Sequence, residues 1–129
     1  MDRGEFLRRL RPMVGIPNTW EADRAAESVL ANLADALPAD EAHDLASQLP
    51  KEYKELVMGR LGQRGPTQAM TWGALIGRVR SNLGLETPEA AEWVTRGVFS
   101  ALKDAVSPGE MEDVAAELPL DLRETLRRA

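Results

Sequence analysis

Apolar residues recur along the chain at spacings of three and four, which is the period of one face of an α-helix. A first stripe holds Phe6, Leu7 and Leu10, and a longer stripe runs through residues 22–37. Proline and glycine separate successive stripes, as helix stops and starts do. The pattern predicts an all-α protein.

The pattern occurs twice, without a gap, at an offset of 69 residues, which places Pro50 on Pro119. We therefore expect two tandem copies of a four-helix unit, at about residues 1–57 and 70–126. The segment between them, about residues 58–69, is rich in glycine and is interpreted as a linker.

A unit of this size buries too little of its surface to be stable alone. The two copies are therefore expected to pack as one compact helical bundle with a pseudo-two-fold axis, a single domain over residues 1–129. An open stack of repeats is less favoured, because such stacks usually need three or more repeats.

Start and stop signals recur at matching places in the two copies. Gly15 and Gly84 suit the left-handed residue that follows a helix end, and Ile16 is expected to add the accompanying hydrophobic contact. Pro50 and Pro119 are expected to break the chain and to open the fourth helix of each unit.

The long second helix of each unit is expected to carry the centre of the core, at Leu33 and Leu102. Asp35 and Asp104 fall in the last turn of these helices, where a negative charge opposes the helix dipole. We predict that an arginine pair neutralises them in structural salt bridges. The two pairs that recur in both copies are Arg9 with Arg78 and Arg11 with Arg80.

Composition narrows the class of protein. With 43% hydrophobic and 29% charged residues the chain is globular. No apolar run approaches the roughly 18 residues of a membrane helix, and no signal-peptide pattern is present. The absence of cysteine excludes disulfides and thiolate sites, and a net charge of −5 argues against nucleic acid and anionic lipid as partners. We therefore expect a cytoplasmic protein with no membrane or nucleic-acid partner.

Candidate chemistry is sparse. Asp40 and His43 have the spacing of two metal ligands on one helical face, with Asp44 beside them. Glu41 and its counterpart Glu110 are explained as first-turn acids that complement a helix N-terminus, and the second copy lacks the histidine. A solvated helix start is therefore favoured over a metal site, and we expect no catalytic residue and no cofactor.

Three tryptophans, Trp20, Trp72 and Trp93, do not coincide at the repeat offset. Large aromatic residues that differ between the copies mark places where a duplicated scaffold has specialised. They are candidates for a groove or a subunit interface, where tryptophan is enriched. The alternative interpretation is ordinary packing in or beside the core.

The motifs EFLRRLR and LADALPADEAHDLASQLPKEYKEL, with the second version SALKDAVSPGEMEDVAAELPLDLRETL, resemble the bacterial family catalogued as domain of unknown function 2267. The resemblance covers nearly the whole chain, and its most specific part is the acidic-Leu-Ala-x-x-Leu-Pro element. It implies a duplicated helical fold and carries no activity onto any residue. Pro38, which stands where the second copy has Ser107, departs from the expected helix cap.

The function favoured by elimination is a non-enzymatic helical module that binds a protein partner or a second copy of itself. One alternative is a carrier of a small apolar ligand, with a pocket between the two repeats. Another is a small metal-dependent enzyme centred on His43. An enclosed apolar cavity would favour the carrier. A carboxylate with a shifted pKa near the histidine would favour the enzyme. Exposed apolar surface would favour the binding module.

Overall fold

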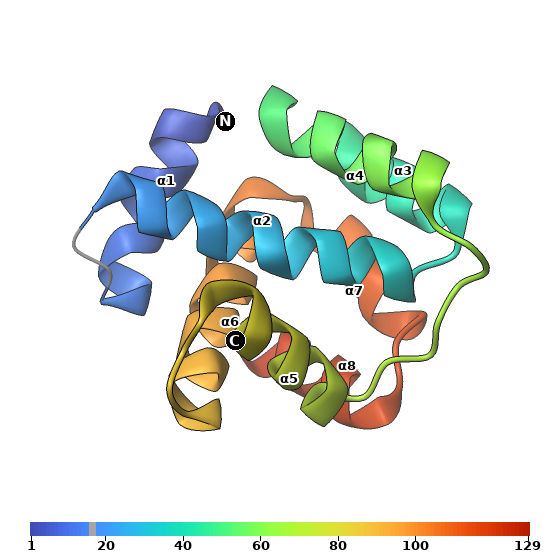
Figure 1. Cartoon of the computed structure of the whole chain (residues 1–129). Helices are drawn as coiled ribbons and strands as arrows, with labels where there is room; N and C mark the ends of the chain where they lie inside the picture. Colours follow the sequence, from blue (N-terminus) through green and yellow to red (C-terminus); the bar gives the residue numbers. More distant parts are fainter. Residues whose placement is uncertain (16–17) are drawn as a thin grey trace.

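In the computed structural model, the described residues, 1–15 and 18–129, form eight α-helices, which confirms the predicted all-α class (Figure 1). Ile16, which was expected to pack behind the first helix, lies outside the described residues. No helix in these ranges is long and apolar enough to cross a membrane. The helices are α1 (Arg3–Val14), α2 (Thr19–Ala36), α3 (Ala39–Ser47), α4 (Lys51–Gln63), α5 (Trp72–Leu83), α6 (Pro88–Ala105), α7 (Pro108–Ala116) and α8 (Leu120–Arg128).

Helix ends follow the expected local chemistry. Gly15 and Gly84 end α1 and α5 in the left-handed region, with φ of 65° and 66°. Pro50 and Pro119 directly precede α4 and α8. Pro38 takes the same place before α3 without a side-chain cap, so α3 begins where the offset predicts even though this cap is missing. Side-chain oxygens cap the other five helix starts, at Asp2, Asn18, Thr71, Thr87 and Ser107.

The fourth helix is longer than the glycine signals suggested. The linker was expected at about residues 58–69, but α4 continues to Gln63, so Gly59 and Gly62 lie inside it. A glycine in a helix interior costs about 0.5–1 kcal/mol relative to alanine. The extension nevertheless forms because Arg60, which lies on it, makes a paired hydrogen bond to Asp35 of α2.

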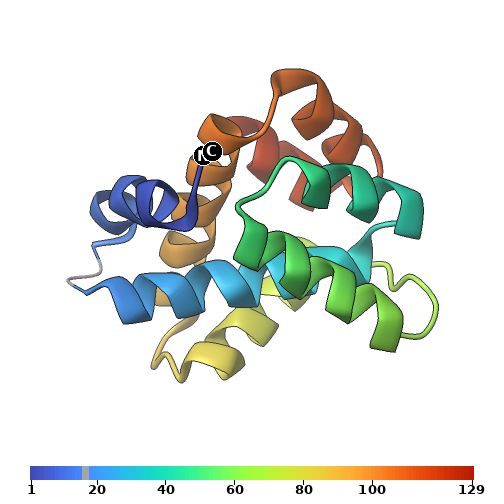
Figure 2. The ribbon, with the colours of Figure 1, turned by 90° about the horizontal axis from the view of Figure 1, so that it is seen from above.

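Helices from the two halves of the chain interleave. The first helix of each half packs on the long helix of the other half, so that α1 contacts α6 and α5 contacts α2. The long helices α2 and α6 also contact each other, and so do α3 and α7. Seen from above, α1 lies beside α6 at one side of the bundle, and α3 lies between α4 and α7 at the other (Figure 2). Each helix of the second half begins 69 residues after its counterpart.

One continuous hydrophobic core fills the space between the helices. Leu33 of α2 and Leu102 of α6 are 1% and 0% exposed, as expected for its centre. The early part of α2 contributes small side chains, which let neighbouring helices approach closely. These are Ala22, Ala25 and Ala26, all fully buried.

The C-terminal end of α2 is buried and is satisfied by arginines from elsewhere in the chain. The last carbonyls of a helix have no partner within it. The Arg64 guanidinium donates hydrogen bonds to the carbonyl oxygens of Ala34, Asp35 and Leu37, at 2.6, 3.1 and 2.7 Å. Arg60 Nε and Nη2 donate to the two carboxylate oxygens of Asp35, at 2.8 and 2.7 Å.

The structure brings the arginines and aspartates singled out in the sequence together across the halves. Arg78 Nη1 lies 3.9 Å from Asp35 Oδ2, and Arg9 Nη1 lies 3.9 Å from Asp104 Oδ2. The other recurring pair, Arg11 and Arg80, makes different contacts. Arg80 of α5 donates to the carbonyl oxygens of residues 85 and 86, just beyond the end of its own helix, and Arg11 is half-buried.

Replacing Leu33 or Leu102 with alanine should lower the free energy of unfolding by on the order of 2–5 kcal/mol, because each leaves a cavity in a dense core. Leu120, which is 67% exposed, is the matched control, and Leu120→Ala should cost under about 0.5 kcal/mol. Urea unfolding followed by circular dichroism measures all three. Equal losses at the three sites would show that the core centre lies elsewhere.

Arg64→Met should destabilise the protein by about 1.5–3 kcal/mol, because three carbonyls at the buried end of α2 lose a charged donor. Lys54→Met, an exposed cation on α4, is the control and should be nearly neutral. Chemical denaturation is again the measurement. A neutral effect of Arg64→Met would mean that water satisfies those carbonyls equally well.

Candidate carboxylate site between α3 and α7

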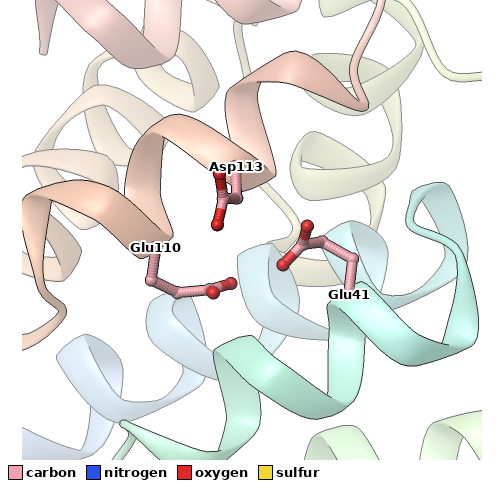
Figure 3. Close-up of side chains that lie close together, drawn as sticks. All are labelled: Glu41, Glu110 and Asp113. Atoms are coloured by element: carbon pink, nitrogen blue, oxygen red, sulfur yellow. The ribbon is translucent and has the colours of Figure 1, made fainter.

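Three carboxylates meet where α3 packs against α7 (Figure 3). Glu41 comes from the first turn of α3, and Glu110 comes from the first turn of α7. Asp113 follows Glu110 by three residues, a spacing that puts both on one face of α7. One oxygen of each group lies within 4.8 Å of the others.

Local structure holds Glu110 at this contact. The Ser107 hydroxyl caps α7 by accepting a hydrogen bond from the Glu110 backbone N–H, at 3.3 Å. The backbone N–H of Ser107 donates to Gln48 Oε1 at 2.7 Å, which joins the end of α3 to the start of α7. Met111 and Val114 of the same helix are buried in the core, so α7 is anchored on both sides of the acid.

Glu110 is an unusual residue to find inside a protein, because it is only 8% exposed. Its Oε2 atom is shielded from solvent and has no hydrogen-bond partner among the described residues. The same holds for Oε2 of the facing Glu41. Asp113 is exposed, so the cluster has one side open to water.

Burial raises the pKa of Glu110 to about 8, and a side-chain hydrogen bond with Glu41 contributes to the shift. The negative charges of Glu41, Asp44 and Asp113 raise the pKa further. The charged groups that contribute most to this shift are all acids. Near neutral pH the protonated carboxyl is therefore favoured, and it can donate its proton to the Glu41 carboxylate.

Two of the metal candidates suggested by spacing, Asp40 and Asp44, lie next to this cluster, and no contact joins His43 to it in the described part of the chain. Asp40, His43 and Asp44 are all exposed. Asp40 Oδ1 accepts a hydrogen bond from the Glu41 backbone N–H at 3.0 Å, and Asp44 adds negative charge near Glu110. Two of the three acids that the structure gathers, Glu41 and Glu110, are instead those that the sequence analysis explained as dipole partners.

The three tryptophans differ in environment. Trp72 is half-buried: its ring centroid lies 6.2 Å from that of Phe99, and the Arg96 guanidinium lies 5.2 Å from it. Trp20 and Trp93 are 66% and 63% exposed. Trp72 therefore belongs to the packing, and the other two present their rings to solvent.

Trp20 borders an open hollow of about 640 Å³ at the beginnings of α1, α2 and α4. Arg3, Asp23 and Glu52 bring charges of both signs to its lining. A second open hollow, of about 510 Å³, is lined by α2, α4 and α5. Its lining includes three arginines, which suits an apolar ligand poorly; these are Arg24, Arg60 and Arg78.

Fold and site together describe an all-α helical bundle with a partly buried acidic cluster between two of its helices. Over residues 3–125 the chain matches the family described as "Uncharacterized conserved protein (DUF2267)", and it belongs to that family. The match covers nearly the whole chain and confirms the resemblance found in its motifs. No curated protein matches the chain. The family description names no activity, and the function is unknown.

Glu110→Gln should flatten the pH dependence of stability in metal-free buffer. The folded pKa of about 8 exceeds the ordinary Glu value, so the folded protein holds a proton that the unfolded chain releases. The free energy of unfolding therefore falls as pH rises between the ordinary Glu pKa and the raised one, with a slope of about 1.4 kcal/mol per pH unit at most. Glutamine stays neutral at every pH, so the variant does not lose this stability as pH rises.

Urea unfolding at pH 5, 7 and 9 in EDTA tests this expectation. Relative to the wild type, Glu110→Gln should gain stability most at pH 9. Glu117→Gln, which changes an exposed acid at the end of α7, should keep the wild-type profile. Parallel profiles for the wild type and Glu110→Gln would contradict the raised pKa.

Proposed function

We propose that this protein is a non-enzymatic helical module that binds a protein partner through the surface around Trp20. The observation that carries the proposal is the exposure of this tryptophan, 66%, beside a hollow formed by three helices. Tryptophan is the side chain most enriched among residues that dominate binding energy. An exposed indole next to a concave surface can bury a large apolar area when a partner docks.

The position of the exposed tryptophans in the repeat pattern supports a binding role. At the offset of 69 residues, Trp20 stands opposite Glu89, and Trp93 stands opposite Arg24. A residue that maintains a shared scaffold would be expected in both copies. Trp20 and Trp93 occur in one copy each, as expected for surfaces that serve a partner.

Charge favours one class of partner. The chain has 21 acidic and 16 basic residues, and its net charge of −5 attracts basic proteins and repels a second copy of itself. We therefore propose a partner of net positive charge that places an apolar side chain against Trp20. A second copy and nucleic acid are less favoured by the same charge.

We further propose that the two halves are copies related by a pseudo-two-fold axis. Support comes from the constant offset of the helix starts and from the reciprocal contacts of α1 with α6 and of α5 with α2. The Arg9–Asp104 and Arg78–Asp35 contacts are reciprocal in the same way.

Trp20→Ala and Trp72→Ala should separate binding from stability. Trp20→Ala should change the free energy of unfolding by less than about 1 kcal/mol, because the side chain is 66% exposed and, among the described residues, its one ring contact is with the Arg24 guanidinium, 5.1 Å from the ring centroid. Trp72→Ala should cost about 2–4 kcal/mol, because its ring packs on Phe99 and under Arg96. Denaturation curves of the two variants make the comparison.

The partner itself is sought with a photo-crosslinking amino acid at position 20 in the native cell. We expect a discrete adduct with a basic protein, and purified partner should bind Trp20→Ala at least about tenfold more weakly than the wild type. The control is a crosslinker at Glu117, which lies at the end of α7 and is not part of the hollow beside Trp20. Identical adducts at both positions, or unchanged affinity of Trp20→Ala, would contradict the proposal.

A further inference from the structure

We propose that Glu41, Glu110 and Asp113 bind one oxygen-preferring divalent cation between α3 and α7. This site is separate from the protein-binding surface proposed around Trp20. Three carboxylates from two helices place one oxygen each within 4.8 Å of the others. All three side chains lie at the contact between α3 and α7, and Glu110 and Glu41 approach each other across it (Figure 3).

Glu110 distinguishes this cluster from an ordinary group of surface acids. Its side chain is more than nine-tenths buried, at 8% exposure, and its carboxyl group points toward Glu41 (Figure 3). The inner oxygens of both glutamates are shielded from solvent and lack a hydrogen-bond partner among the described residues. Buried acceptors without a donor cost free energy, and a bound cation would remove that cost.

The chemistry of the ligands limits the cation. Three carboxylates and no imidazole or thiolate suit hard ions such as Mg²⁺, Mn²⁺ and Ca²⁺. Oxygens on opposite sides of a Ca²⁺ ion lie roughly 4.6–5.2 Å apart, and those around Mg²⁺ lie closer. The separation of at most 4.8 Å therefore accommodates an ion of this class. The exposed Asp113 side leaves room for water to complete the coordination.

A shared proton is the competing occupant, because it would also satisfy one oxygen on each glutamate. The two occupants differ in stoichiometry and in which residues they need. A proton joins Glu41 and Glu110 alone, whereas a cation also requires Asp113. Replacing Asp113 with asparagine therefore discriminates between them.

The experiment is thermal unfolding of EDTA-treated protein in 10 mM MgCl₂, MnCl₂ or CaCl₂, against NaCl of equal ionic strength. At least one divalent ion should raise Tm by about 3–8 °C more than NaCl does. Calorimetric titration with that ion should give one site per chain, with Kd of roughly 10⁻⁴ to 10⁻³ M. Sodium chloride controls for simple screening of the acidic surface.

Glu110→Gln and Asp113→Asn should each abolish the divalent rise in Tm, and Glu117→Gln should retain it. All three replace an acid on or at the end of α7 with its neutral analogue, and far-UV circular dichroism verifies that each variant folds. In a second measurement, Mn²⁺ should broaden amide NMR signals of α3 and α7 before those of α1. The proposal is overturned if no divalent ion exceeds NaCl, or if Asp113→Asn responds like the wild type.

Discussion

The buried C-terminal end of α2 is the constraint on which the rest of the structure depends. This helix packs against α1, α3, α4, α5 and α6, so its last carbonyls and the carboxylate of Asp35 lie inside the protein rather than in water. Buried polar groups of this kind are costly unless they are paired. Arg60 of α4 and Arg64 at its C-terminal end donate hydrogen bonds to these groups. The end of α2 therefore determines where α4 stops and how the chain leaves it.

The same constraint joins the two halves of the chain. The backbone N–H of Gln68 donates to the carbonyl of Asp35, and the side chain of Gln68 accepts a hydrogen bond from Arg78 of α5. The connection between the halves is thus fixed against α2 before α5 begins. With α5 held on α2 and α1 on α6, the chain is an interleaved bundle rather than two separate units.

Much of the fold could be predicted because its signals are local. Glycine at a helix end and proline at a helix start act through their own backbone geometry, and Gly15, Gly84, Pro50 and Pro119 lie where those rules place them. The end of α4 was misplaced because Gly59 and Gly62 were taken as breaks. Their local cost is offset by contacts of Arg60 and Arg64 with α2, which helix propensity cannot reveal.

The acidic site could not be predicted because it also depends on contacts between helices, although the sequence analysis had named Glu41 and Glu110. The repeat offset pairs Glu41 with Glu110, and each acid taken alone suits the N-terminus of its own helix. Only the packing of α3 on α7 sets the two against each other. An acid that stabilises the start of its own helix is therefore unfavourable when the two helices pack together. Two carboxylates in a shielded site cannot both remain charged without a positive partner. The contact between α3 and α7 therefore depends on the charge of Glu110, and it is the place where solution conditions can act on how the halves are joined.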